Sequence, residues 1–332
     1  MSFTPPALSE PVPCVPSGQV VWGMQLPIQS QSSLYVSDWE LSASVEDLAS
    51  IAVAADQSGC FYLGVCDHTA IPERLADAMG TVWYDTVATL GWLAALTSRT
   101  RLLSHVLVLA QRHPLRAAKE LATLDLLSGG RLVVGIGAGH VSEEFDQLGG
   151  PDAFATRGAD TDEAVSALMR CLEEEAPSVD GASWSFSEMH VAPRPVQTPR
   201  PPLWIGGSSR PALRRTAAFG DGWLPQGTRR KDLPGQIAEL RRLRDELRGG
   251  APIDIGTIAE PLYVTETEGQ DAGWDLPSYV AVGGPERTAS SLNELVAMGV
   301  THLQIPFRVR SVAEFIEQTQ RFGETVAPLL GS

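Results

Sequence analysis

Short apolar runs alternate with amphipathic stretches along almost the whole chain. The runs have the length and residue types of β-strands, and the stretches between them repeat apolar residues at helical spacing. The eight predicted strands cover residues 19–26, 61–66, 101–109, 131–137, 202–206, 222–225, 254–264 and 301–307. Runs such as LVVGIG and LWIGG are continuously apolar, which is typical of parallel strands buried on both faces.

Residues at the helix boundaries support the same alternation. Ser44 with Asp47, and Ser311 with Glu314, have the spacing of residues that cap a helix N-terminus. Pro114 suits the first turn of another helix, because a proline there has no hydrogen bond to lose. Helices are therefore predicted to begin at these three places.

Eight strands alternating with helices predict an α/β fold, a (β/α)8 TIM barrel, as a single domain over residues 19–332. A doubly wound open sheet is the alternative. The alternation is interrupted at 140–160 and 177–201, so we place insertions after strand 4 and before strand 5. Residues 1–18 contain five prolines and predict an N-terminal arm outside the barrel.

Composition and charge restrict the partners and the location of the protein. The chain has 332 residues and a net charge of −15, which argues against nucleic acid because binding phosphates requires a basic face. No apolar run reaches the roughly 18 residues that a membrane helix needs, and residues 1–18 lack the features of a secretory signal. The four cysteines are scattered along the chain and form no CxxC pair. This distribution is typical of buried, unpaired thiols in a reducing compartment. We expect a cytoplasmic protein with no membrane contact.

Polar residues gather just after the predicted strands, where a barrel of this kind carries its active site. Asp67 and His68 follow the second strand, and an imidazole that titrates near neutrality suits proton transfer. On position alone, a loop-capping aspartate beside a surface histidine fits equally well. Residues 206–209, GGSS, lie between a strand and a helix and could bind a phosphate with backbone N–H groups. An ordinary tight turn is the alternative.

Other motifs are weak or missing. GIGAGH at 135–140 lacks the third glycine of a dinucleotide-binding fingerprint. The six histidines have none of the spacings typical of metal ligands, so no metal site is expected. Neither a GxSxG motif nor a phosphate-binding P-loop is present.

Four segments, in order, resemble the luciferase-like monooxygenase superfamily, and most closely its coenzyme F420-dependent oxidoreductases. They are VCDH (65–68), HPLRAAKELATLDLLSGGRLVVGIGAGHVSEEF (113–145), LWIGGSSRPALRRTAAFGDGW (203–223) and VGGPERTASSLNELVAMGVTHLQI (282–305). The resemblance implies a TIM barrel of the bacterial luciferase-like type. It also implies a homodimer in which a flavin-like ring lies across the mouth of each barrel.

The resemblance assigns proton handling to His68, with Asp67 before it, beside the cofactor ring. His140 stands where some F420 enzymes carry a glutamate, so His140 either replaces that acid or faces solvent. A non-prolyl cis peptide bond is common in this family on strand 3 and would fall within residues 106–110. The residues that would contact the cofactor are Gly137, Gly139, Gly206, Gly207, Ser208, Val108 and Ala110.

The predicted function is hydride transfer between coenzyme F420 and a small organic substrate. A rival within the superfamily is an FMN-dependent monooxygenase, which takes reduced flavin from a partner reductase and activates O2. Two rivals of other classes are a non-catalytic cofactor-binding barrel and a phosphate-binding lyase or isomerase barrel. Because F420 is polyanionic, arginines near residues 210–230 are expected to offset the negative net charge. An acidic mouth would favour FMN.

Overall fold

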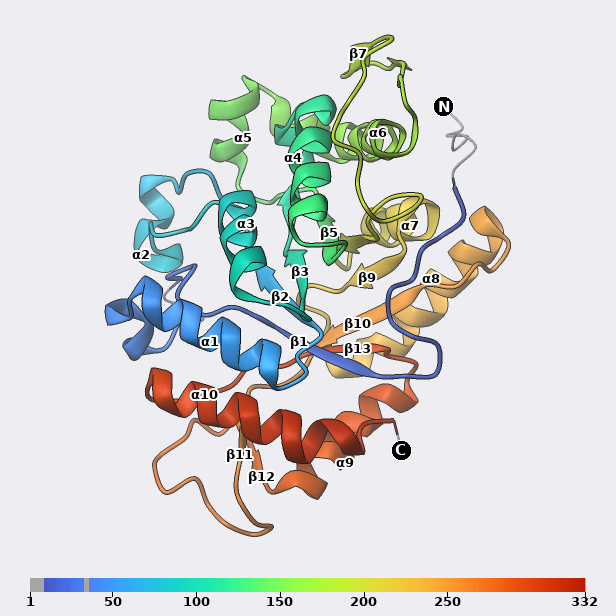
Figure 1. The fold of residues 1–332 in the computed structure, drawn as a ribbon. Coiled ribbons are helices and arrows are strands. Elements are labelled where there is room, and N and C mark those ends of the chain that lie inside the picture. Colours follow the sequence, from blue (N-terminus) through green and yellow to red (C-terminus); the bar gives the residue numbers. More distant parts are fainter. Residues whose placement is uncertain (1–8, 33–35, 332) are drawn as a thin grey trace.

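The computed structural model describes residues 9–32 and 36–331 (Figure 1). Within them, eight strands close into a barrel in which every strand is parallel to both neighbours. In order around the ring these are β1 (Val21–Gln25), β2 (Tyr62–Val65), β3 (Arg101–Ser104), β5 (Leu132–Gly137), β8 (Leu203–Gly206), β9 (Gly222–Leu224), β10 (Asp254–Ile258) and β13 (His302–Gln304). The predicted (β/α)8 barrel is confirmed, and the open sheet is excluded because β3 pairs with β5 and β13 with β1.

All eight predicted strands are present, but two of the predicted runs are each divided into two strands. The run 101–109 is divided between β3 and β4 (Leu107–Val108), which resumes the pairing with β5 after a non-prolyl cis peptide bond between His105 and Val106. The run 254–264 breaks after β10. Pro261, which has no N–H to donate, lies in the gap, and β11 (Leu262–Val264) leaves the barrel to pair with β12 (Ala281–Gly283).

Helices surround the barrel (Figure 1). The longer ones are α1 (Val45–Gln57), α3 (Thr86–Leu96), α4 (Pro114–Leu127), α6 (Ala153–Glu173), α7 (Arg210–Phe219), α8 (Leu233–Arg248), α9 (Pro285–Ala297) and α10 (Val312–Arg321). None of the helices in the described part of the chain is long and apolar enough to cross a membrane.

The predicted helix starts are found where the capping residues placed them. Ser44 and Asp47 form a reciprocal capping box at α1, and α4 begins with Pro114. At α10 the Ser311 hydroxyl accepts the Glu314 N–H, but the Glu314 carboxylate bonds to Arg310 instead of completing the box.

The predicted insertions both lie between β5 and β8. Residues 140–160 hold α5 (Ser142–Gly149) and the start of α6. Residues 177–201 hold a small hairpin formed by β6 (Val179–Asp180) and β7 (Ser185–Phe186), which stands out from the barrel in Figure 1. A further excursion, residues 259–284 with β11 and β12, was not predicted.

The N-terminal arm closes the end of the barrel at which the strands begin. The Cys14 and Val15 N–H groups donate to the Asp254 carboxylate at the start of β10, and the Val12 N–H donates to Asp221. Val15 also joins the side chains that fill the barrel interior, which are Tyr62, Leu103, Val133, Trp204 and Leu224. The first eight residues of the predicted arm lie outside the described part of the chain.

Candidate active site

His68, in the loop after β2, is paired with an acidic residue from the insertion. Its Nδ1 lies 3.1 Å from Oε2 of Glu144, in the first turn of α5. The two side chains are only 11% and 4% exposed. The pair therefore forms at the C-terminal end of the barrel, where the helix α5 meets the loop after β2.

The Glu144 carboxylate is held in its charged form. Burial opposes its ionisation, but hydrogen bonds from His68 and from the Thr69 and Ala70 N–H groups outweigh burial and lower the pKa of Glu144 below its ordinary value. An ionised carboxylate can only accept hydrogen bonds, so Nδ1 of His68 must donate. Nε2 is then the nitrogen available to exchange a proton with a ligand, as in general acid–base catalysis.

Two further rings surround His68. Trp83, from the loop before α3, and His140, from the turn after β5, both stand edge-on to it, with ring centroids 4.6 and 5.4 Å away. His68 and Trp83 are half-buried, whereas His140 is exposed. Partial burial of its ring, and then the nearby His68, lower the pKa of His140, although Glu144 opposes this shift. The fold thus brings both predicted histidines to one place.

Asp67 is fully engaged by protein groups. Its Oδ2 accepts the Val108 N–H at 2.8 Å, and its Oδ1 accepts Nη2 of Arg112 at 2.8 Å and the Thr86 hydroxyl at 3.1 Å. The carboxylate therefore fixes the segment that follows the cis peptide bond. Asp67 is placed to position β4, and Ala110 follows β4 in a short 3-10 turn, η3 (Leu109–Gln111).

Two of the predicted glycines make room for Val106. A Cβ atom on Gly137 would lie 2.4 Å from Cγ2 of Val106, and one on Gly206 would lie 3.0 Å from Cγ1. Val106 is the second residue of the cis bond, which begins at His105 and so one residue before the predicted stretch. Its side chain packs against the barrel interior and forms a floor between the ends of β5 and β8. Gly139, with φ +70°, turns above Phe145 of α5.

The turn between β8 and α7 is the place where the sequence predicted backbone groups for a phosphate. Gly207 has a φ of +102°, which glycine adopts readily. The Ser208 hydroxyl donates to the Gln226 carbonyl at 3.0 Å, and Ser209 caps the ten-residue helix α7 by accepting the Ala212 N–H. A helix start behind such a turn favours an anion. By contrast, no group of three His, Cys, Asp or Glu side chains in the described ranges is placed to hold a metal ion.

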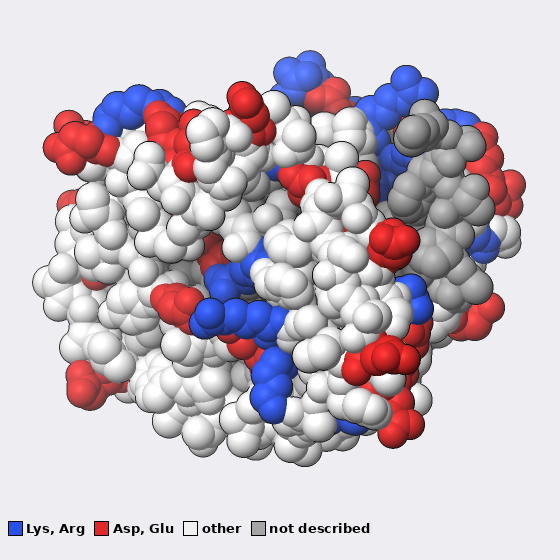
Figure 2. All heavy atoms as spheres, turned by 90° about the horizontal axis from the view of Figure 1, so that it is seen from above, with Lys and Arg blue, Asp and Glu red and all other residues white. Residues whose placement is uncertain are grey.

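The arginines expected to offset the net charge are largely neutralised by partners. Arg215 pairs with Asp162 at 2.5 Å, and Arg229 pairs with Asp232 at 2.7 Å. Arg230 pairs with two glutamates. Of the five arginines between residues 210 and 230, the two that form no ion pair with the described residues are Arg210 and Arg214. Figure 2 shows Lys and Arg side chains around a hollow near the centre of one face, with acidic side chains beside them.

Sequence reasoning missed Glu144 and did not single out Trp83. Glu144 follows Glu143 on an amphipathic helix, where charged residues by default face solvent. A signal was present, because Glu144 lies four residues after His140 within the segment that resembles the family most strongly.

Comparisons with known proteins identify the family. The model of the luciferase-like monooxygenase family matches residues 22–272. An uncharacterized protein of Mycobacterium tuberculosis is 33% identical over 180 residues, which cover 54% of this chain and 61% of that protein. The FMNH2-dependent dimethylsulfone monooxygenase of Pseudomonas putida is 28% identical over 195 residues, covering 58% of this chain and 52% of that protein. The matches thus span about half to three fifths of these curated relatives.

A solved structure extends the likeness to nearly the whole chain. The coenzyme F420-dependent tetrahydromethanopterin reductase from Methanopyrus kandleri superposes with a TM-score of 0.70, covering 93% of this chain and 99% of that one. Its sequence identity is 17%, so this likeness shows the fold alone.

Proposed function

This chain belongs to the luciferase-like monooxygenase family, and we propose that it is an oxidoreductase that transfers a hydride between coenzyme F420 and a small organic substrate. The observation that carries the proposal is the His68–Glu144 pair at the mouth of the barrel. When bound, the deazaflavin supplies the hydride chemistry. The protein must then position the cofactor and substrate and transfer a proton. The His68–Glu144 pair is suited to the proton transfer.

Each side chain of the mouth has a distinct task in this proposal. His68 gives or takes the proton through Nε2, while Glu144 fixes its tautomer and stabilises its charged form. Asp67 acts as a positioning residue through Val108. Trp83, packed edge-on against His68, keeps water from one side of the imidazole.

The turn at Gly206–Ser208, with the start of α7, would hold the cofactor phosphate, and exposed Arg210 adds positive charge beside it. Val106 and the Gly137 turn would support the ring from below. The family resemblance also favours a cytoplasmic homodimer, and we include both in the proposal.

The alternative function, an FMN-dependent monooxygenase served by a partner reductase, is favoured by one observation. The ion pairs of Arg215, Arg229 and Arg230 leave little free positive charge near the phosphate turn. FMN ends at its phosphate, whereas F420 continues into a polyanionic tail that needs more cationic surface. The P. putida relative is named for FMNH2.

Fluorescence titration of the purified chain with F420 and with FMN tests both functions. F420 should bind one site per chain with a Kd of about 1–10 μM, and FMN at least about tenfold more weakly. Ser208→Ala should weaken binding, whereas Ser50→Ala, on the exposed face of α1, should not. The reverse preference would select the FMN-dependent function, and no binding of either cofactor would overturn both.

A further inference from the structure

His68 is largely shielded from water by the side chains that surround it. Its own side chain is 11% exposed, and the Glu144 carboxylate bonded to its Nδ1 is 4% exposed. Trp83 covers another side of the imidazole, with ring centroids 4.6 Å apart. A residue that exchanges a proton with a ligand must return to its starting protonation state before the next turnover. A route for protons between His68 and water is therefore needed.

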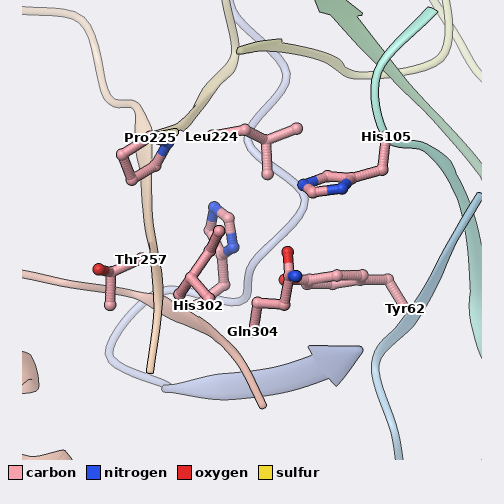
Figure 3. A pocket seen from close by; sticks show the side chains of 8 residues that line it. Tyr62, His105, Leu224, Pro225, Thr257, His302 and Gln304 are labelled. Atoms are coloured by element: carbon pink, nitrogen blue, oxygen red, sulfur yellow. The ribbon is translucent and has the colours of Figure 1, made fainter. Parts of the chain in front are cut away.

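The barrel interior beneath the mouth does not provide this route. Figure 3 shows the side chains of Tyr62, His105, His302 and Gln304 gathered inside the barrel, and they leave no room between them for a water molecule. Burial lowers the pKa of His105 to about 4 and that of His302 to about 3. Neither imidazole therefore accepts a proton readily near pH 7. A proton is expected to leave His68 sideways, along the mouth.

His140 is the neighbour of His68 that combines a titratable ring with exposure to water. The indole of Trp83 only donates a hydrogen bond and does not titrate, and Glu144 is buried. His140 is exposed and stands edge-on to His68, with ring centroids 5.4 Å apart. At this separation the two rings can exchange a proton directly after a small rotation or through one water molecule. An imidazole accepts and releases protons in the neutral pH range, as such a step requires.

One carboxylate serves both imidazoles. Glu144 raises the pKa of His140, but partial burial of the ring and the nearby His68 lower it, and the lowering prevails. A positive charge on one ring thus opposes a charge on the other, so the two rings hold one proton more readily than two. Two more charged side chains lie near this turn, namely Arg157, which donates to the carbonyl of the residue before His140, and Glu143, which is paired with Arg74.

We propose that His140 is the proton relay between His68 and bulk water. A proton that His68 takes up at Nε2 passes to the free ring nitrogen of His140 and from there to water or to a buffer base. The route runs in reverse when His68 has given its proton to a ligand. Each step breaks one bond to hydrogen and forms another, and nothing is oxidised or reduced. The inference rests on the proposed function, in which His68 exchanges a proton at Nε2.

The rate of proton exchange at His68 tests this proposal on the complete chain without cofactor. Nitrogen-15 relaxation dispersion of histidine-labelled protein, recorded through the titration of His68, measures how fast its ring gains and loses a proton. In His140→Ala this rate should fall at least about tenfold in a dilute buffer. Added imidazole should restore the rate, because the free base takes the place of the missing ring. His190→Ala, at an exposed histidine in the insertion before β8, should leave the rate unchanged.

Two results would overturn the proposal. An unchanged rate in His140→Ala would mean that water reaches His68 without His140. A slower rate that imidazole does not restore would mean that His140 only supports the packing of the mouth. Failure here is distinguishable from failure of the proposed function, because that function is tested by titration with F420 and FMN, and neither cofactor is present in this experiment.

Discussion

A single histidine carries the chemistry proposed for the mouth of the barrel. His68→Ala should lower kcat by about 10²–10⁴-fold, the usual contribution of general acid–base catalysis. Its cofactor Kd should stay within a few fold, because no part of the phosphate turn is touched. Steady-state assays over a panel of small organic substrates, paired with cofactor titration, measure both quantities. Unchanged turnover would remove His68 from the mechanism.

Glu144 acts through His68, and its neighbour provides a matched control. Glu144→Gln keeps the shape of the side chain but removes the charge that orients and stabilises the imidazole, so kcat should fall by at least about tenfold. Glu143→Gln removes the charge from a surface carboxylate that pairs with Arg74 and accepts the Ser142 hydroxyl, and kcat should not change. The pH profile of kcat should shift in the first variant alone. Equal effects of the two substitutions would point to a structural role.

The two members of this pair differ in how far the sequence could predict them. His68 directly follows an apolar strand, so its place at the mouth could be read from local pattern and family resemblance. Its contact with Glu144 spans 76 residues and depends on how α5 folds back over the mouth. No local pattern encodes that approach, so the acidic partner emerged only from the structure.

At the level of elements, periodicity and capping residues predicted the barrel well. Their errors have physical causes. The run 101–109 is strongly apolar on both sides of Ser104 and His105, and strand propensity cannot register the break between Ser104 and Leu107. The run 254–264 contains Pro261, and that proline was a usable signal for the end of β10.

The hairpin of β6 and β7 depends on one carboxylate. Glu163 of α6 accepts the backbone N–H groups of Ala182, Ser183 and Trp184. Glu163→Ala should destabilise the hairpin locally by about 1–3 kcal/mol, because three backbone N–H groups lose a charged acceptor. Hydrogen exchange of residues 181–184 should speed up markedly. Glu174→Ala, which loses only a surface pair with Arg170, should leave that exchange unchanged, and similar protection in both variants would contradict the anchoring role.

For the whole molecule, buried groups set the pH dependence of stability. The pKa of His105 is lowered to about 4 and that of His302 to about 3 by burial. The unfolded chain therefore takes up these protons first, and stability is lost as pH falls below about 6.5. Burial raises the pKa of Asp254 to about 6, so the folded chain takes up that proton first and stability is gained as pH falls through 6. The loss of stability from the two histidines is larger than the gain from the one aspartate, so the net stability falls as the pH falls.

Urea unfolding between pH 7 and pH 4.5 measures this balance. The three groups together should cost about 1.4 kcal/mol per pH unit below pH 6, the equivalent of one proton. His302→Leu should reduce that slope, whereas Asp254→Asn should steepen it, because it removes the compensating group. Identical slopes in wild type and both variants would contradict the assignment.

The arrangement of the arm shows what whole-chain reasoning could not predict. Its proline content indicated a segment outside the barrel, but not that Val15 would enter the barrel interior. The bond from the Cys14 N–H to Asp254 spans 240 residues. A contact of that range depends on the closed barrel, which brings the start of β10 beside the arm.

The tautomer and ligand response of His68 test the central claim most directly. Nitrogen-15 NMR of histidine-labelled protein, with the signal assigned through His68→Gln, reports which ring nitrogen carries the proton. We predict the Nδ1–H tautomer, loss of that preference in Glu144→Gln, and a clear change at Nε2 when F420 or FMN saturates the protein. An Nε2–H tautomer, or a His68 signal unaffected by cofactor, would contradict a proton-transferring pair at the cofactor site.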